Sequence, residues 1–167
     1  MRGDEAREAG PSCAGLLLAG GRSRRMPGIN KAFALLQGRP MIRHVLDTLQ
    51  TCFSAVYIVA KEKATYTGLG VDVNEDRLAV QTPLAGIHAG LTATREDFVF
   101  CCPCDTPLIG PALIQLLLTE IQPGAGQKPL PDVVVPRLGP YRQPLCALYG
   151  RPCLPVIEEL LAAGETK

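Results

Sequence analysis

Two short segments carry side chains that could bind a magnesium–triphosphate group. The first, Leu18–Lys31, reads LAGGRSRRMPGINK and joins two adjacent glycines to a run of arginines. Adjacent glycines such as Gly20 and Gly21 let the backbone approach a ligand closely and direct successive N–H groups at phosphate oxygens. Arg25 and Lys31 add positive charge beside those amides. The segment therefore predicts a triphosphate-binding loop.

Two better-known phosphate loops fit this segment less well. The dinucleotide fingerprint needs glycines spaced as G-x-G-x-x-G, whereas Gly20 and Gly21 are adjacent. The Walker loop needs G-K-[ST], but two residues separate Gly28 from Lys31 and no hydroxyl residue follows the lysine. On residue types alone, a solvated basic turn after a strand stays open as the alternative.

The second segment, Phe98–Pro107, reads FVFCCPCDTP and places one carboxylate, Asp105, just after an apolar run. A carboxylate beside a triphosphate is the usual protein ligand of Mg²⁺, which takes further oxygens from phosphate and keeps most of its waters. Asp105 is therefore the candidate metal ligand. The alternative is that it only shapes an Asp-Thr-Pro turn before the next helix, and its residue type does not separate the two.

Short apolar runs predict the strands that would position these residues. The expected strands are Cys13–Ala19, Ala55–Ala60, Phe98–Cys102, Val133–Val135 and Leu145–Tyr149. Runs this apolar indicate strands that are buried on both faces, as in a parallel sheet.

Helical patterns alternate with these runs. The expected helices are Pro40–Thr51, with Met41, Val45, Leu46 and Leu49 on one face, Pro111–Ile121, and Pro155–Ala163 with Gly164 as its C-cap. Pro123–Pro131 is expected to be a loop. The alternation predicts an α/β fold of three layers, α/β/α, around a mostly parallel, mixed sheet. In such sheets ligands bind beyond the carboxyl ends of the strands, where the glycine-rich loop and Asp105 would lie.

The composition fits one enzyme-sized domain with an aliphatic core. The chain has 167 residues, of which 47% are hydrophobic and 20% charged, and it contains no tryptophan. A net charge of +1 supplies no general field for nucleic acid or an anionic membrane. No apolar run approaches the roughly 20 residues that a membrane span needs. We expect a tail over 1–12, one domain over 13–167, and a cytoplasmic protein.

The seven cysteines are interpreted as buried, reduced thiols. Cys101 and Cys104 have the C-x₂-C spacing of zinc ligands, but no second pair with ligand spacing follows. Structural thiols are therefore expected, and a metal–thiolate site is rejected.

The first segment resembles the L-A-G-G-x-x-x-R-M-x-G-x-[DN]-K signature of the sugar-nucleotide and cofactor nucleotidyltransferases. It is most similar to the molybdenum cofactor guanylyltransferases, which are MobA-like NTP transferases. Pro27 stands where those enzymes usually have Gly, and Asn30 where they usually have Asp. These departures predict a stiffer loop and a less well oriented Lys31.

The resemblance implies a Rossmann-like nucleotidyltransferase fold and assigns roles to particular residues. C-P-C-D-T-P is the form that the metal-binding segment takes in the family, so Asp105 is the implied Mg²⁺ ligand. The stretch after Thr82 resembles the family's G-P-L-A-G-I, with Thr82 in place of its first Gly. The implied catalytic residues are Arg25, Lys31 and Asp105. The implied nucleotide-binding residues are Leu18, Ala19, Gly20, Gly21, Lys31, Asp76, Pro83, Leu84, Ala85, Gly86 and Asp105.

Two features near these residues leave alternatives open. Gly86 and Gly90 permit either close packing or a ligand-facing helix start. Arg137 and Arg142 meet the acceptor phosphate or are simply solvated, and solvation is favoured.

By resemblance, the segment from Gln143 to Leu145 lies near the second substrate. The chain is expected to lack the family's C-terminal strand and helix, with their N-x-N-T-P segment.

The implied reaction is transfer of GMP from GTP to the phosphate of molybdopterin, with Mg²⁺ and release of pyrophosphate. The implied partners are therefore GTP and a pterin phosphate, with transient contacts to cofactor-biosynthesis or delivery proteins. A molybdenum cofactor cytidylyltransferase is the alternative within the fold, although such enzymes tend to carry L-A-A-G at the loop. A nucleotide-binding protein that has lost transfer is the alternative from another class. All of these enzymatic assignments require Lys31 and Asp105 to share one crevice.

Overall fold

The computed structural model describes residues 10–20, 30–78, 80, 82–122 and 129–165. Its centre is a six-stranded sheet in the order β5-β4-β1-β6-β10-β7. The strands are β1 (Cys13–Leu18), β4 (Val56–Ala60), β5 (Asp72–Glu75), β6 (Phe98–Pro103), β7 (Val133–Val134) and β10 (Ala147–Gly150). The predicted strands are therefore present, with ends shifted by one or two residues.

The sheet is mostly parallel, as predicted. β1 pairs in parallel with both β4 and β6, and β4 pairs in parallel with β5. β10 runs antiparallel to β6 and to β7, which makes the sheet mixed. β5 lies at the edge and reads DVNE, so it lacks the apolar run from which the other strands were predicted.

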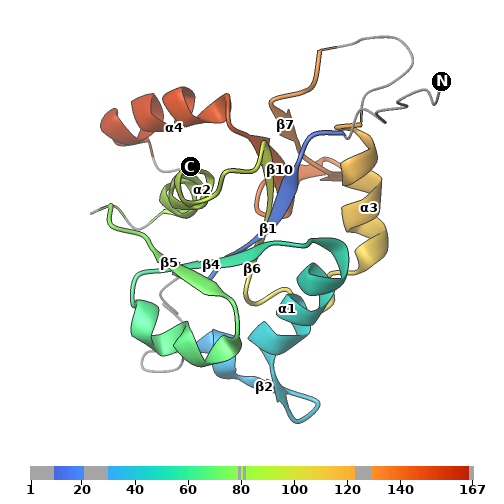
Figure 1. Ribbon diagram of the computed structural model, residues 1–167, viewed down its shortest axis with the longest axis vertical. Coiled ribbons are helices and arrows are strands. Elements are labelled where there is room, and N and C mark those ends of the chain that lie inside the picture. Colours follow the sequence, from blue (N-terminus) through green and yellow to red (C-terminus); the bar gives the residue numbers. More distant parts are fainter. Residues whose placement is uncertain (1–9, 21–29, 79, 81, 123–128, 166–167) are drawn as a thin grey trace, which may run out of the picture.

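Four helices cover the two faces of the sheet and complete the three layers (Figure 1). α1 (Met41–Cys52) and α3 (Pro111–Thr119) pack on one face, and α2 (Pro83–Ala93) and α4 (Cys153–Ala162) pack on the other. Two 3₁₀ helices, η1 (Lys31–Phe33) and η2 (Lys63–Leu69), connect elements near the ends of β1 and β4. Two hairpins complete the described fold, β2 (Leu35–Leu36) with β3 (Arg39–Pro40) and β8 (Arg137–Leu138) with β9 (Tyr141–Arg142).

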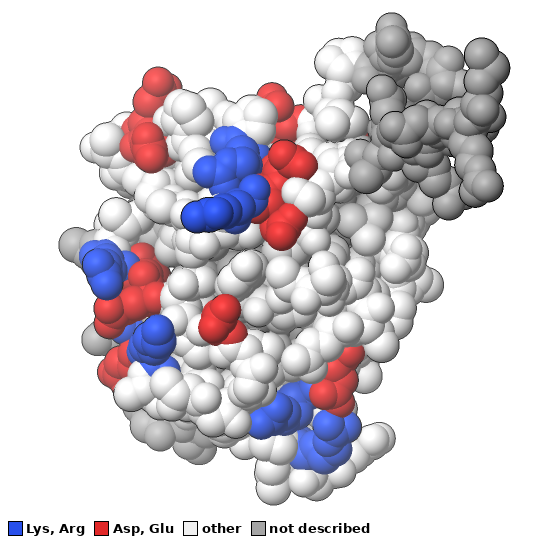
Figure 2. Space-filling view, in the orientation of Figure 1, with Lys and Arg blue, Asp and Glu red and all other residues white. Residues whose placement is uncertain are grey.

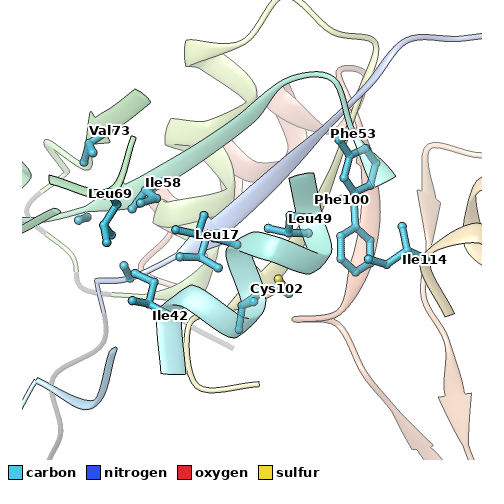
Figure 3. Packing of buried hydrophobic residues seen from close by; sticks show 14 of the residues in the cluster. Leu17, Ile42, Leu49, Phe53, Ile58, Leu69, Val73, Phe100, Cys102 and Ile114 are labelled. Carbon is cyan, nitrogen blue, oxygen red and sulfur yellow. The ribbon is translucent and has the colours of Figure 1, made fainter. Parts of the chain in front are cut away.

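The larger of two apolar clusters lies between the sheet and the α1–α3 layer (Figure 3). Its aromatic centre is the stacked pair of Phe53 and Phe100, with ring centroids 5.9 Å apart. Helix α1 buries Ile42 together with Val45, Leu46 and Leu49. The predicted stripe began at Met41, which is only half-buried. Ile42 replaces it because 42, 45, 46 and 49 follow the i, i+3, i+4, i+7 spacing of one helical face.

Helix α4 begins at Cys153, two residues before the predicted start at Pro155. Proline is tolerated there because the first amides of a helix have no intrahelical partner. At the other end, Gly164 adopts φ +75° and its N–H donates to the Leu161 carbonyl, while the Glu165 N–H donates to Leu160. This pair of bonds is the Schellman motif, so Gly164 ends the helix as predicted, one residue after its C-cap, Ala163.

None of the described helices is both long and apolar enough to cross a membrane.

Glycines let α2 approach the centre of the sheet. A Cβ on Gly90 would lie 2.2 Å from Cδ2 of Leu16, and one on Gly86 would lie 3.0 Å from Cδ2 of Leu18. Both leucines belong to β1. Close packing of helix on strand is therefore the observed role of the two glycines.

We expect Gly90→Ala to lower the free energy of unfolding by about 1–3 kcal/mol, because Leu16 is completely buried and has no room to move aside. Urea unfolding measures the change. Gly86→Ala is the matched control, since both changes gain the same helix propensity of about 1 kcal/mol. The neighbour of Gly86 is Leu18, which is only half-buried and can shift to make room for the added methyl group. Equal stability of the two variants would contradict the packing account.

Candidate active site

The end of β1 lies beside the end of β6, and this pairing places Asp105 at the crevice. Leu18 is in register with Pro103, and the Cys104 N–H donates to the Leu18 carbonyl at 3.1 Å. Asp105 therefore follows directly from a residue that is hydrogen-bonded to the end of β1, and it is exposed there. Gly21 and Arg25, both predicted to bind phosphate, lie outside the described residues.

Lys31 is held at the same edge through Asn30. The Asn30 side chain caps η1 by accepting the Ala32 N–H at 3.1 Å, and its Nδ2 donates to the Tyr66 hydroxyl at 3.0 Å. Tyr66 in turn donates to the Ala19 carbonyl at 2.9 Å. This chain of bonds ties the residue before Lys31 to the end of β1. The Asn30 side chain thus ties the backbone just before Lys31 to the sheet, and the less well oriented Lys31 expected from the sequence stays a prediction.

Tyr66 is the part of this relay that sequence reasoning missed. It is 4% exposed, and burial raises the pKa of its phenol, so the hydroxyl stays protonated and able to donate. No motif marks Tyr66 in the sequence, because its partners lie 36 and 47 residues away along the chain.

Cys104 is affected by both charges that matter most for the predicted chemistry. The pKa of its thiol is raised to about 11, first by burial and then by the Asp105 carboxylate, while the Lys31 ammonium lowers it. The bond from the Cys104 N–H to the Leu18 carbonyl and the Asn30–Tyr66–Ala19 bonds attach the residues just before Asp105 and Lys31 to the end of β1. The backbone at both predicted residues therefore lies near that end of the strand.

The remaining cysteines behave as apolar side chains. All seven thiols are free, and burial raises the pKa of Cys101 to about 12 and that of Cys102 well above its usual value. The Cys101 thiol donates to the Pro144 carbonyl at 3.7 Å. Neutral, packed thiols are not metal ligands. The described part of the chain also holds no group of three or more His, Cys, Asp or Glu side chains that could bind a metal ion.

A single exposed carboxylate nevertheless fits Mg²⁺. This ion keeps several waters and is typically held by one or two carboxylates together with substrate phosphates. Asp105 is placed where it could supply that carboxylate, and Lys31 could supply charge for the phosphates.

Asp76, predicted to contact the nucleotide, is buried and already has partners. Its Oδ2 lies 3.1 Å from the Lys61 ammonium, and its Oδ1 accepts the Leu78 N–H at 3.1 Å. Its exposed fraction is 7%. Lys61 is a second residue that sequence reasoning missed.

The stretch Pro83–Gly86 forms the first turn of α2, with Pro83 at its start. Thr82 is the N-cap, and its hydroxyl accepts the Ala85 N–H at 3.2 Å. The Gly86 N–H donates to the Thr82 carbonyl at 3.3 Å. Thr82 thus stands in place of a family glycine because its hydroxyl caps the helix. Gly86 faces Leu18, which brings this turn next to the end of β1.

The last third of the chain reaches the same edge. The Pro144 carbonyl accepts bonds from Cys101 of β6 and from the Tyr149 hydroxyl, the latter at 2.8 Å. Asp105 acts on the nearby Cys146 thiol and raises its pKa, after the larger effect of burial. The residues around Gln143 to Leu145 therefore lie close to Asp105.

The β8–β9 hairpin extends from this region. Arg137 is directly opposite Arg142, and Leu138 is directly opposite Tyr141. Successive side chains of a strand point to opposite faces, so the two arginines share one face of the hairpin. Both are exposed. Like charges directly opposite each other repel, which an anion placed between them would relieve.

Charge elsewhere is evenly mixed. On the face drawn in Figure 2, basic and acidic side chains lie next to one another in small groups separated by uncharged surface. This distribution agrees with the net charge of +1, and it leaves anion binding to local groups such as Lys31.

Comparisons with known proteins identify similar chains. Residues 15–167 match the family described as "MobA-like NTP transferase domain". The chain is 40% identical, over 90% of its length and 71% of the relative's, to a molybdenum cofactor guanylyltransferase of Desulfosudis oleivorans. It is 35% identical to the corresponding protein of Aliivibrio salmonicida, over 91% of this chain and 76% of the relative.

Solved structures agree. Molybdopterin-guanine dinucleotide biosynthesis protein A of Archaeoglobus fulgidus superposes with a TM-score of 0.75 at 25% identity, covering 92% of this chain and 75% of that one. A CMP:2-keto-3-deoxy-manno-octonic acid synthetase complexed with CTP superposes with a TM-score of 0.70 at 16% identity, covering 89% and 78%. The second likeness supports the Rossmann-like nucleotidyltransferase fold.

Proposed function

Because this chain belongs to the family of MobA-like NTP transferase domains, we propose that it is a molybdenum cofactor guanylyltransferase. It transfers GMP from GTP to the phosphate of a molybdopterin and releases pyrophosphate. Relatives with that name at 32–40% identity support the assignment. The structural observation that supports it is that the residues just before Lys31 and Asp105 are both hydrogen-bonded, Asn30 through Tyr66 and Cys104 directly, to the end of β1 at the carboxyl edge of the sheet.

The reaction needs positioning and charge rather than a protein nucleophile. An oxygen of the acceptor phosphate attacks the α-phosphorus of GTP, the bond from that phosphorus to the bridging oxygen breaks, and pyrophosphate leaves with the electron pair. Lys31 and the amide at Gly20 bind the triphosphate, with Gly21 and Arg25 in the same roles by resemblance. Asp105 would hold Mg²⁺, which when bound would neutralise charge on the phosphates. Positioning and electrostatic stabilisation of this kind supply most of the catalysis in such transfers.

The acceptor enters from the side of the β8–β9 hairpin. Two anions must approach each other in this reaction, so the acceptor phosphate needs positive charge of its own. Arg137 and Arg142 supply it on one face of the hairpin, and an arginine side chain can bind phosphate through two parallel bonds. The Pro144 contacts anchor the base of the hairpin beside β6.

Two other functions use the same site differently. A cytidylyltransferase is the alternative within the fold, and Ala19-Gly20-Gly21 favours the guanylyl type over it. A nucleotide-binding protein without transfer is the alternative from another class.

A turnover assay with several nucleotides separates these three functions. With Mg²⁺ and a molybdopterin acceptor, we expect pyrophosphate release from GTP to exceed that from CTP by at least about 100-fold in kcat/KM. Omitting the acceptor is the control and should abolish release. A preference for CTP would identify the cytidylyl alternative, and GTP binding without turnover would identify the binding protein.

A further inference from the structure

Lys61 and Asp76 form an ion pair at the same edge of the sheet as Asp105. Lys61 directly follows β4, Asp76 directly follows β5, and the Asp76 N–H donates to the Ala60 carbonyl at 2.9 Å. The ammonium lies 3.1 Å from Asp76 Oδ2, and the exposed side-chain fractions are 24% for Lys61 and 7% for Asp76. The pair is therefore largely withdrawn from water, unlike an ordinary surface ion pair.

The Lys61 ammonium is directed at one short segment. It donates to the Asp76 carbonyl at 3.1 Å and to the Leu78 carbonyl, and it forms an ion pair with Asp76 Oδ2 at 3.1 Å. Lys61 is thus engaged by the protein itself, which distinguishes it from a lysine that binds ligand phosphates.

The Asp76 carboxylate also binds the backbone of the same short segment. Its Oδ1 accepts the Leu78 N–H at 3.1 Å, while its Oδ2 faces Lys61. Residues 76–78 are therefore held through the Asp76 side chain and through the backbone groups at both of their ends. Bonds to a charged donor are about twice as strong as neutral ones, so loss of Lys61 would release most of this restraint.

We propose that Lys61 is a positioning residue for nucleotide binding. Its ammonium fixes the Asp76–Leu78 turn, and with it the position of the Asp76 carboxylate at the edge where β4 and β5 end. This inference rests on the proposed function, because Asp76 is a residue through which the nucleotide would be contacted.

Lys61→Met tests the inference, since it keeps an unbranched apolar stem but removes the charge and all three donors. We expect the KM and the Kd for GTP to rise about 10-fold, with kcat within about twofold of wild type. Hydrogen exchange at the Leu78 amide should accelerate, while exchange in α3 should not change. Arg77→Met is the matched control, because Arg77 is 87% exposed and lies 3.7 Å from Glu75. It should leave all of these values unchanged.

A second variant separates positioning from the burial of an unpaired charge. Lys61→Met combined with Asp76→Asn removes the unpaired carboxylate but does not restore the bonds to the Asp76 and Leu78 carbonyls. Because Asp76 is itself a predicted nucleotide contact, the double variant is compared with Asp76→Asn alone. We expect the double variant to have the higher KM and Lys61→Arg to recover part of the affinity. Equal KM values for the double variant and for Asp76→Asn alone would overturn the inference, because Lys61 would then act only on the charge of Asp76.

The outcomes also distinguish this inference from the function on which it rests. If wild-type protein binds GTP and Lys61→Met binds it equally well, Lys61 has no positioning role and the proposed function stands. If the wild-type protein binds no GTP at all, both are overturned.

Discussion

Asp105→Asn is expected to lower kcat/KM for GMP transfer by a factor on the order of 10²–10³. Asp105 follows β6 and comes directly after Cys104, whose N–H donates to the Leu18 carbonyl at the end of β1. Asparagine keeps the size and the polar character of the side chain but loses the charge that Mg²⁺ prefers in its ligands. The loss should therefore appear as a raised Mg²⁺ concentration for half-maximal turnover as well as a slower rate.

Asp72→Asn is the control for the loss of an exposed carboxylate, since Asp72 lies on the edge strand β5 and is exposed. Because Asp105 is exposed as well, both variants should unfold within about 0.5 kcal/mol of wild type. Wild-type turnover by Asp105→Asn, at an unchanged Mg²⁺ requirement, would mean that Asp105 only shapes its turn.

Lys31→Ala should reduce kcat/KM for GTP to a similar degree, on the order of 10²–10³. The lysine begins η1, whose cap is made by Asn30 rather than by Lys31 itself, so its removal should leave the local backbone in place. Steady-state kinetics at several GTP concentrations measures the effect. A positive charge near phosphates that become more negative in the transition state contributes to kcat as well as to binding.

Lys63→Ala is the matched control for Lys31→Ala. Lys63 is exposed in η2, and its loss changes net charge by the same amount, so any general electrostatic effect on GTP would appear in both variants. Equal kinetics for the two variants would show that Lys31 acts only through net charge. Lys31→Arg should retain part of the activity because it keeps the charge with a different donor geometry.

The elements of the fold were predictable where local patterns are strong. The apolar runs at β1, β4 and β6 and the helical spacing over α1 and α3 predicted those elements to within one or two residues, apart from the buried stripe of α1. β5 escaped prediction because an edge strand does not need an apolar run, and a strand with one buried valine among three polar or acidic residues can still pair in parallel with β4.

The site was predictable only where residue types and local patterns carry a signal. Gly20, Lys31 and Asp105 are residue types that bind phosphate and metal, and each follows or precedes a recognisable element. Tyr66 and Lys61 carry no such signal. Tyr66 supports Lys31 only because η2 brings it back to the end of β1, and Lys61 holds the Asp76–Leu78 turn only because β4 and β5 are neighbours.

The sequence by itself determined the alternation of strands and helices. It also determined the chemistry of the two segments Leu18–Lys31 and Phe98–Pro107. Residue type and short periodicity suffice for this, because both act over a few neighbouring positions. Only the tertiary structure decided that Lys31 and Asp105 lie at the same edge of the sheet and that Gly86 and Gly90 serve helix packing. It also decided that Lys61 forms its ion pair with Asp76. Each of those facts depends on contacts between chain segments that are far apart in sequence. Strand order and burial fix these contacts, and local sequence patterns do not encode them.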